Sequence, residues 1–353
     1  MIYINARFLT QELTGVQRYA KEISLALMLL RDDIIFLVPK NIVFQEFAES
    51  ATIRIVGRNT GYLWEQYDLP RYLETLGSPL LVNLCNLAPV FYKNKVITLH
   101  DITYKRFPKS YKWQFRSIYN FVTPFLIRSC KKVVTVSNFS KNELINNFSC
   151  NADDVDVVYN AVSRSFIYNS ETVSKTEVKY FLALSSPLYH KNLRFLIDVF
   201  LAFSKKYDVE LRVVGDRNHA NLSFDSDKFD ELNASRVKFL GRVDDNSLSE
   251  LYRNAVAFVF PSLYEGFGIP PIEAQACGCP VISSNAASMP EVLQDSAFFF
   301  SPESNAELYS AMELLMLDKN LREELVASGR ENARRFSWSK SAEKLNSLLD
   351  SII

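Results

Sequence analysis

The chain has 353 residues, with 40 basic and 40 acidic side chains, so its formal net charge is zero. This length suits two domains, each large enough to bury a core. A hydrophobic content of 48% and a charged content of 23% exclude a disordered chain. Zero net charge argues against a general nucleic-acid-binding protein. No nucleic acid is therefore expected among the partners.

The cysteines and the uncharged stretches bear on the compartment. Five cysteines are scattered along the chain without a CxxC motif, which favours a reducing environment. Arg7 interrupts the apolar run that opens the chain, so no secretory signal is expected. The longest uncharged stretch, 75–92, contains Pro79 and Pro89 and is a poor membrane-spanning helix. We expect a cytoplasmic protein, and its peripheral association with the inner face of the cytoplasmic membrane is left open.

Short β-branched runs alternate with segments of helical period along most of the chain. In the first half, strands are predicted at 2–5, 34–38, 54–56, 80–84, 96–99, 133–136 and 156–159, with helices at 15–30, 64–76, 109–129 and 138–147. In the second half, strands are predicted at 180–184, 211–214, 238–240, 257–260, 280–282 and 297–300, with helices at 192–207, 247–254 and 269–277. Two such series predict two doubly wound α/β domains.

The polar stretch 163–177 has few apolar residues and is predicted to be the linker. We expect an N-terminal domain of residues 1–165, joined by the terminal helix 338–353, and a C-terminal domain of residues 166–337. In such sheets, ligands bind beyond the carboxyl ends of the strands.

The strongest chemical signal follows the predicted strand that ends at Phe260. The next residues form a loop with Glu265, Gly266 and Gly268, and two prolines then suit a first helical turn. Amide groups at a helix start attract a phosphate or diphosphate, and glycine lets a ligand approach the backbone. Glu265 and Glu273 would repel a bare phosphate but would accept hydrogen bonds from sugar hydroxyls. A purely structural role near the positive helix end is the alternative for each glutamate.

This segment resembles the Glu-x7-Glu signature of family 4 retaining glycosyltransferases, which have the GT-B fold. Further phrases occur in the family's order, at Thr14–Tyr19, His100–Asp101, Val136–Lys141, Tyr159–Val162, His190–Leu193, Pro290–Val292 and Phe336–Trp338. The resemblance implies two Rossmann-like domains that face a cleft. The N-terminal domain would bind the acceptor, and the C-terminal domain would bind the nucleotide-sugar donor.

The resemblance also implies roles for individual residues. Three are expected to be catalytic: Glu265 on the donor sugar, His100 on the same sugar from the other domain, and Lys191 on the diphosphate. Donor-binding residues are expected at Gly15, Ser185, His190, Gly266, Phe267, Gly268, Ile269 and Glu273.

Some positions depart from the family pattern. Ser185 and His190 stand where many members carry an arginine near the phosphate-binding lysine, and Ala161 replaces a usual glycine. Positive charge for the leaving diphosphate must then come from elsewhere, with Arg7, Arg18, the helix amides or a protonated His190 as candidates.

Residues 105–132 contain eight lysines or arginines, no acid and many large aromatics. Such a stretch suits an anionic membrane surface or a lipid-linked acceptor, and the alternative is a solvated helix whose aromatic side chains belong to the core. The expected patch consists of Lys105, Arg106, Lys109, Lys112, Trp113 and Arg116.

Together these features predict a retaining hexosyltransferase that moves a sugar from a nucleotide-diphosphate donor, UDP or GDP, to a lipid-linked glycan of the bacterial cell surface. By resemblance, the acceptor attacks on the face that the leaving group departs from. No metal or other cofactor is expected, because the helix amides and Lys191 can stabilise the diphosphate. Asp154-Val155-Asp156 forms a DxD motif, but it precedes a predicted strand, which is the wrong context for a metal site. The alternatives are a nucleotide-sugar epimerase on the same fold and a non-catalytic sugar-nucleotide-binding or membrane-adaptor protein.

Overall fold

The structure is a computed structural model that describes residues 1–12, 14–167, 178–184, 188–215 and 236–353. The chain forms two compact units. Unit 1 comprises Met1–Lys105, Trp113–Asn160 and Ser337–Ile353, and unit 2 comprises Arg106–Lys112 and Ala161–Phe336. These boundaries lie five residues and one residue before the expected ones at 165 and 337. Residues Arg106–Lys112, which we expected in the N-terminal domain, group with unit 2.

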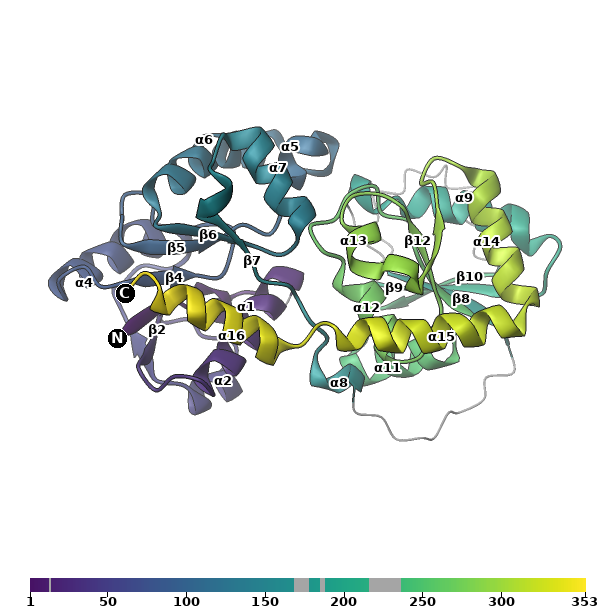
Figure 1. The fold of residues 1–353 in the computed structure, drawn as a ribbon, viewed down its shortest axis with the longest axis horizontal. Coiled ribbons are helices and arrows are strands. Elements are labelled where there is room, and N and C mark those ends of the chain that lie inside the picture. The colour runs from purple at the N-terminus through teal and green to yellow at the C-terminus, as the bar shows by residue number, and fades with distance from the viewer. Residues whose placement is uncertain (13, 168–177, 185–187, 216–235) are drawn as a thin grey trace. The chain divides into compact units, whose positions relative to one another are not determined.

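Unit 1 is built on a parallel sheet of seven strands in the order β3-β2-β1-β4-β5-β6-β7 (Figure 1). Most of its strands are short apolar runs buried on both faces, as expected for a parallel sheet covered by helices. The direction of winding reverses between β1 and β4, where Asn5 and Asn83 are register partners. The strands are β1 (Ile2–Asn5), β2 (Ile34–Val38), β3 (Ile53–Ile55), β4 (Leu81–Asn83), β5 (Lys95–Thr98), β6 (Lys132–Thr135) and β7 (Val155–Val157).

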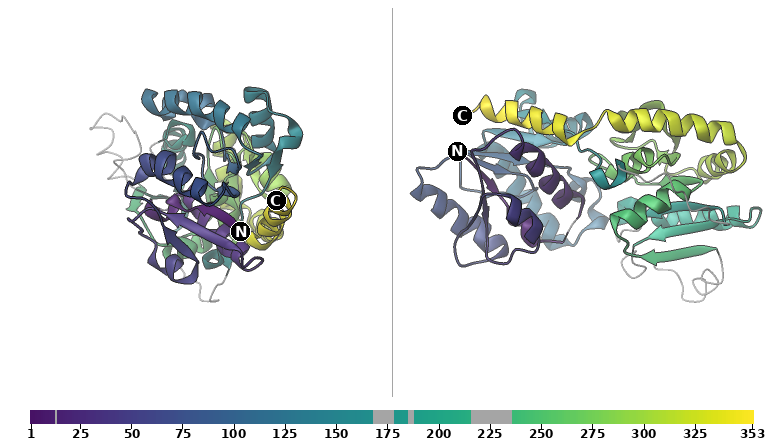
Figure 2. Two further views of the ribbon diagram at one scale, coloured as in Figure 1. Left: turned by 90° about the vertical axis from the view of Figure 1, so that its left-hand side faces the viewer. Right: turned by 90° about the horizontal axis from the view of Figure 1, so that it is seen from below.

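Helices cover both faces of this sheet (Figures 1 and 2). The C-terminal helix α16 packs on α1, where the buried Tyr19 ring meets Trp338 edge-on at 5.8 Å. The Ser341 hydroxyl donates to the Tyr159 carbonyl at 2.7 Å and fixes α16 further. The expected return of the terminal helix to the first domain is therefore confirmed. The helices are α1 (Gly15–Met28), α2 (Gln45–Ser50), α3 (Gly61–Leu63), η2 (Trp64–Asp68), α4 (Leu69–Thr75), α5 (Thr103–Arg106), α6 (Trp113–Ser129), α7 (Asn138–Phe148) and α16 (Trp338–Asp350), with 3-10 turns η1 (Arg7–Thr10) and η4 (Ala152–Asp154).

Unit 2 contains a parallel sheet of six strands in the order β10-β9-β8-β11-β12-β13. Its winding reverses between β8 and β11, which pair directly. The strands are β8 (Tyr180–Leu184), β9 (Glu210–Val214), β10 (Val237–Gly241), β11 (Ala257–Phe260), β12 (Val281–Ser284) and β13 (Phe298–Phe300).

Two groups of helices sandwich the unit 2 sheet. On one side α9 and α14 bury Phe200 and Ala311 against the strands, and on the other side α12 packs on α11 and α15. The helices are α8 (Arg164–Ile167), α9 (Leu193–Ser204), α11 (Asp245–Asn254), α12 (Ile269–Ala276), α13 (Met289–Leu293), α14 (Asn305–Leu317) and α15 (Lys319–Arg334), with 3-10 turns η3 (Pro108–Ser110), η5 (Tyr189–Lys191) and η7 (Gln294–Ser296).

Two local expectations were wrong. Residues Arg164–Ile167 were expected in the linker but form α8, because Phe166 is fully buried and packs edge-on against Tyr252 with ring centres 6.2 Å apart. The remainder of the predicted linker, 168–177, lies outside the described residues. The helix expected from 109 begins only at Trp113, because Pro108–Ser110 form a separate turn.

Candidate functional site

At the switch point of unit 2, the structure brings two of the predicted residues together. Lys191 ends the turn that follows β8, and Glu265 lies in the loop after β11. The Lys191 Nζ and the Glu265 Oε1 are 2.6 Å apart, although the residues are 74 positions apart in sequence. The Lys191 side chain is 25% exposed and the Glu265 side chain is 13% exposed, so a ligand can still reach both charges.

The backbone of this loop is shaped by Gly268 at the N-cap of α12. Gly268 has a φ of +83°, and a Cβ there would lie 2.4 Å from the Met289 Cε. Only glycine fits both the left-handed backbone and the space. Ile269 opens the helix, two prolines follow in its first turn, and Gly268 has no side chain to cap the amides. Pro270 and Pro271 have no N–H, so the start of α12 offers the amides of Gly268 and Ile269 together with the positive dipole end.

Neighbouring side chains hold the loop in place. The Phe267 ring is buried and packs edge-on against Phe336 at 5.2 Å, so only its backbone is suited to contact a ligand. The Ser288 hydroxyl donates to the Glu265 carbonyl at 3.0 Å. Gly266 is buried in the same loop, and Glu273 is 5% exposed within α12.

The ion pair is compatible with ligand binding. A lysine ammonium has three N–H donors, and a carboxylate has two acceptor oxygens. Lys191 can therefore bind a phosphate oxygen while it still contacts Glu265, and Glu265 can accept from a sugar hydroxyl through its other oxygen.

His190 faces the segment Arg106–Lys112 of unit 2. Its Nδ1 lies 2.9 Å from the Ser110 Oγ, which also accepts from the His190 amide at 3.2 Å. The rings of Phe107 and Tyr111 lie beside the imidazole, and the His190 side chain is buried. These contacts give His190 a structural role, and its phosphate contact stays a prediction. Ser185 lies outside the described residues.

His100 lies two residues after β5 in unit 1 and is buried. Its Nε2 is 3.1 Å from the Leu84 carbonyl oxygen, and the Tyr19 ring meets the imidazole edge-on at 4.8 Å. Burial lowers the pKa of His100 below its usual value and so favours the neutral ring. Because a carbonyl only accepts, Nε2 carries the proton and Nδ1 is left as an acceptor. Asp101 accepts from the Thr103 amide at 2.9 Å.

Gly15 is the first residue of α1, and a Cβ there would meet no atom within 4 Å. The Thr14 hydroxyl contacts the Gln17 side chain, and its side chain does not cap the α1 amides. The space above Gly15 is consistent with the close approach of a ligand that the sequence predicted.

No sequence motif pointed to the buried polar cluster at the switch point of unit 1. Asn5 Nδ2 donates to Glu65 Oε1 at 2.7 Å and to Asn83 Oδ1 at 3.0 Å. The Arg7 Nε lies 3.2 Å from the same Glu65 oxygen. Glu65 is not part of a recognisable motif. Asn5 and Asn83, however, are polar residues at the last positions of two apolar strands, and this signal could have pointed to the carboxyl edge of the sheet.

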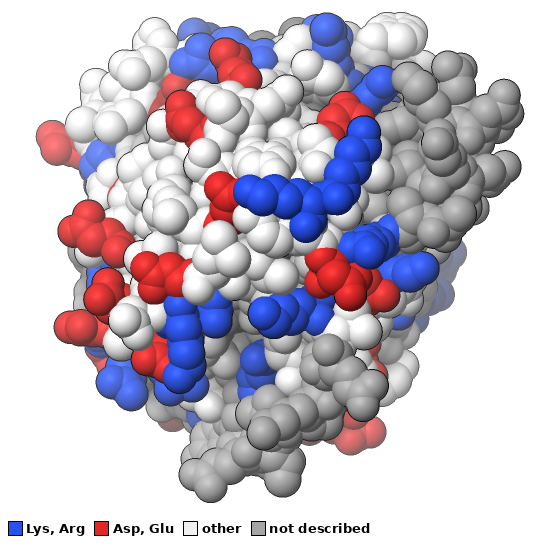
Figure 3. Space-filling model, turned by 90° about the vertical axis from the view of Figure 1, so that its right-hand side faces the viewer, with Lys and Arg blue, Asp and Glu red and all other residues white. Residues whose placement is uncertain are grey.

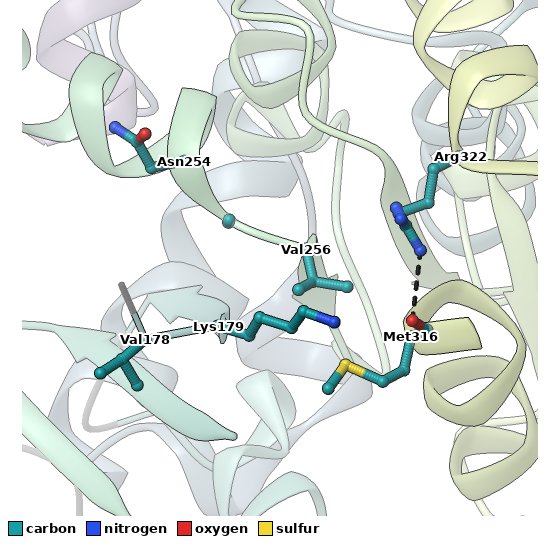
Figure 4. A pocket seen from close by; sticks show the side chains of 7 residues that line it. Val178, Lys179, Asn254, Val256, Met316 and Arg322 are labelled. Atoms are coloured by element: carbon teal, nitrogen blue, oxygen red, sulfur yellow. Dashed lines mark hydrogen bonds between the residues drawn. The ribbon is translucent and has the colours of Figure 1, made fainter. Parts of the chain in front are cut away.

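A pocket of about 220 Å³ lies elsewhere in unit 2, at the amino ends of β8 and β11 (Figure 4). Val178, Lys179, Val256 and Met316 line it. Arg322 also lines it and donates to the Leu315 and Met316 carbonyls at 2.6 and 3.3 Å, so its guanidinium caps α14. Ligand sites of open sheets lie at the opposite strand ends, and this pocket is therefore structural.

The basic aromatic stretch is partly exposed. Lys105, Arg106, Lys109 and Lys112 are exposed, and Arg116 is half-buried. Four large apolar side chains on α6 are also exposed: Trp113 at 68%, Ile118 at 55%, Phe121 at 68% and Phe125 at 46%. The alternative in which the aromatic side chains are core is wrong for Trp113 and Phe121. In the described part of the chain, the helices are too short or too polar to cross a membrane.

The two carboxylates of Asp154-Val155-Asp156 contact different partners. Asp154 Oδ2 accepts from the Asn151 side chain at 3.2 Å, and Asp156 forms a 3.8 Å ion pair with Lys132. Over the described ranges, no group of three or more His, Cys, Asp or Glu side chains has the arrangement of a metal site.

Two family models match consecutive parts of the chain. Residues 13–166 match Glycosyltransferase Family 4, and residues 167–332 match Glycosyl transferases group 1. The chain is 32% identical to the O-antigen chain mannosyltransferase RfbU of Salmonella typhimurium, over 71% of this chain and 69% of that protein. It is 29% identical to the O-antigen chain mannosyltransferase B of Escherichia coli, over 71% and 70% of the two chains. The solved complex of Anabaena HepE with UDP and glucose has the same fold, with a TM-score of 0.78, 17% identity and 99% coverage of both chains.

Proposed function

Since this chain belongs to the family 4 glycosyltransferases of the GT-B fold, we propose that it transfers a hexose, with mannose as the first candidate, from a nucleoside-diphosphate sugar to a glycan acceptor. The single observation that carries this proposal is the Lys191–Glu265 pair beside the start of α12. Relatives named as O-antigen mannosyltransferases support the sugar and an acceptor of the lipopolysaccharide type. The fold of HepE, solved with UDP and glucose, supports a nucleotide-sugar donor.

The chemistry breaks the bond between the anomeric carbon and the diphosphate. Negative charge grows on the leaving oxygen, and Lys191 with the amides at the start of α12 stabilises it. Preorganised donors of this kind commonly supply the largest part of catalysis. Glu265 orients the sugar through a hydroxyl, and neutral His100 offers Nδ1 as a further acceptor. The acceptor hydroxyl attacks on the side from which the diphosphate departs, its proton passes to a diphosphate oxygen, and configuration is retained. The proposal involves no metal.

A lipid-linked acceptor fits two features that are each described within one unit: the exposed bases of Arg106–Lys112 in unit 2 and the exposed apolar side chains of α6 in unit 1. Exposed bases attract anionic headgroups by about 1 kcal/mol each, and exposed aromatic side chains enter the interface. The charges elsewhere differ: on the face drawn in Figure 3, lysines and arginines are interspersed with aspartates and glutamates. The proposed site of action is the cytoplasmic face of the membrane.

Donor use is tested with the full chain and UDP-, GDP- and dTDP-hexoses. The expected result is that one donor raises the unfolding temperature, is slowly hydrolysed without acceptor and gives a product of the same anomeric configuration with acceptor. Epimerised free donor, or no donor binding, would contradict the proposal.

Membrane association is tested by flotation with vesicles of neutral and of anionic lipid. Flotation only with anionic vesicles is expected, and exchange of Lys109 and Lys112 for glutamate should abolish it. Equal behaviour with both lipids would remove the membrane part of the proposal and leave donor use untouched.

A further inference from the structure

The polar cluster of unit 1 lies at the place where an open parallel sheet most often binds its ligand. Asn5 ends β1 and Asn83 ends β4, and the winding order reverses between these two strands. Glu65 reaches the same edge from η2, which is a π-helix, and such helical irregularities are frequent at functional sites. Trp64 anchors η2 because its buried ring donates to the Val56 carbonyl at 2.7 Å.

In both asparagines of the cluster the side-chain oxygen accepts a hydrogen bond and the side-chain nitrogen donates at least one. The Asn5 Oδ1 accepts from the Arg7 amide at 3.2 Å, and its Nδ2 donates to Glu65 and Asn83. Asn83 donates onward to the Val96 carbonyl at 3.2 Å. These hydrogen bonds fix the Glu65 carboxylate through its Oε1. The cluster is therefore a preorganised support rather than a loose group of polar side chains.

The two charged residues of the cluster, Arg7 and Glu65, can form more hydrogen bonds than they form among the described residues. Glu65 is 1% exposed, and its Oε2 has no hydrogen-bond partner among the described residues. Arg7 is 8% exposed, its Nε lacks a hydrogen bond of good geometry, and none of the described residues bonds its two terminal nitrogens. A buried carboxylate oxygen without a hydrogen bond, and a nearly buried guanidinium whose only charged partner is that same carboxylate, are costly unless a ligand or another group completes them.

An aromatic ring completes the arrangement. The Arg7 guanidinium lies 4.7 Å from the centre of the Tyr62 ring, and Tyr62 is 56% exposed. The cluster thus combines the Arg7 guanidinium, the buried Glu65 carboxylate and the exposed Tyr62 ring. Because the two charges offset each other, the arrangement favours a neutral polyol over a phosphate. Sugar hydroxyl groups can accept from the guanidinium, which the carboxylate holds in place, and the apolar face of a sugar ring stacks on tyrosine.

We infer that Arg7, Tyr62 and Glu65 form a binding site on unit 1 for a neutral pyranose, the sugar unit of the acceptor glycan. This inference rests on the proposed function, because the acceptor is taken to be a glycan. Arg7 and Tyr62 contact the sugar, and Glu65 is the positioning residue that fixes Arg7.

The experiment uses the full chain and a panel of methyl glycopyranosides, with binding followed by saturation-transfer NMR. At least one pyranoside is expected to bind the unaltered protein. Tyr62→Ala and Arg7→Met should each weaken that binding at least tenfold, and Tyr62→Phe should restore it because the ring is kept. Glu65→Gln should weaken pyranoside binding while the affinity for the nucleoside diphosphate product stays unchanged.

A matched control exists in the same unit. Arg71 lies over the Tyr67 ring at 3.9 Å, also at an exposed tyrosine. Arg71→Met and Tyr67→Ala should leave pyranoside binding intact. Because Tyr62 is exposed, Tyr62→Ala tests the site even if Arg7→Met fails to fold.

Three outcomes would overturn the inference. They are the absence of any pyranoside signal, unchanged binding in Tyr62→Ala, and displacement of the pyranoside by inorganic phosphate, which would make Arg7 an anion site. The proposed function is separable from this result, because donor binding and donor hydrolysis are measured without pyranoside.

Discussion

Each of the two switch points holds one basic side chain paired with one glutamate, but the surroundings of the two pairs differ. In unit 2, Lys191 and Glu265 meet at 2.6 Å from two loops, beside the open start of a helix, and keep part of their exposure. In unit 1, Arg7 and Glu65 are buried and are supported by two asparagines. A partly exposed pair beside helix amides suits a ligand whose charge changes during reaction. A buried pair with a fixed support suits recognition of a neutral ligand.

The largest effect is expected from Glu265→Gln, which removes the carboxylate at the reacting sugar. Transfer should fall at least about 100-fold, the loss typical of one preorganised polar group in an active site. Steady-state kinetics with the best donor measures this loss. Glu303→Gln, at an exposed position of the same unit, is the control and should keep full activity. Normal turnover by Glu265→Gln would remove the site assignment.

Lys191→Met is expected to weaken binding of the nucleoside diphosphate product by about 10- to 100-fold, as for the loss of a charged hydrogen bond. Calorimetry with UDP and GDP measures the change. Lys206→Met is the matched control, because Lys206 also pairs with a glutamate at 2.8 Å but is exposed on the surface. Equal affinity in the Lys191 and Lys206 variants would show that the phosphates bind elsewhere.

The glycines of the two loops should respond differently to alanine. Gly268→Ala forces a side chain into a left-handed backbone and against Met289, and it should lower the free energy of unfolding by about 1–3 kcal/mol. Gly15→Ala meets open space at a helix start and should leave stability unchanged or slightly higher. Thermal unfolding of both variants tests this contrast, and equal losses of stability would contradict it.

The smallest effect concerns pH. Burial holds the pKa of His100 below its value in the unfolded chain, about 6.5. As the pH falls below about 6.5, the unfolded chain binds the proton first, so the folded state loses stability; above that pH the effect disappears. His100→Gln should therefore reduce the loss of stability between about pH 6.5 and 5. Identical pH profiles for both proteins would mean that His100 is not held neutral by burial.

The sequence alone predicted the thirteen strands that the described residues form, and all of them lie within two residues of their expected limits. Short apolar runs separated by helical periods carry this information locally. The glycine-rich loop at Glu265 was also predicted from adjacent residues, whereas the role of Lys191 was implied by the family resemblance.

Tertiary structure decided which distant residues meet. The sequence did not show that Lys191 pairs with Glu265, that Asn5 and Asn83 support Glu65, or that Phe166 turns part of a predicted linker into a buried helix. These contacts depend on the order of strands in each sheet and on the packing of helices across it. Local periodicity reports which face of an element is buried but not which element covers it, and for that reason only the folded chain reveals the two switch points.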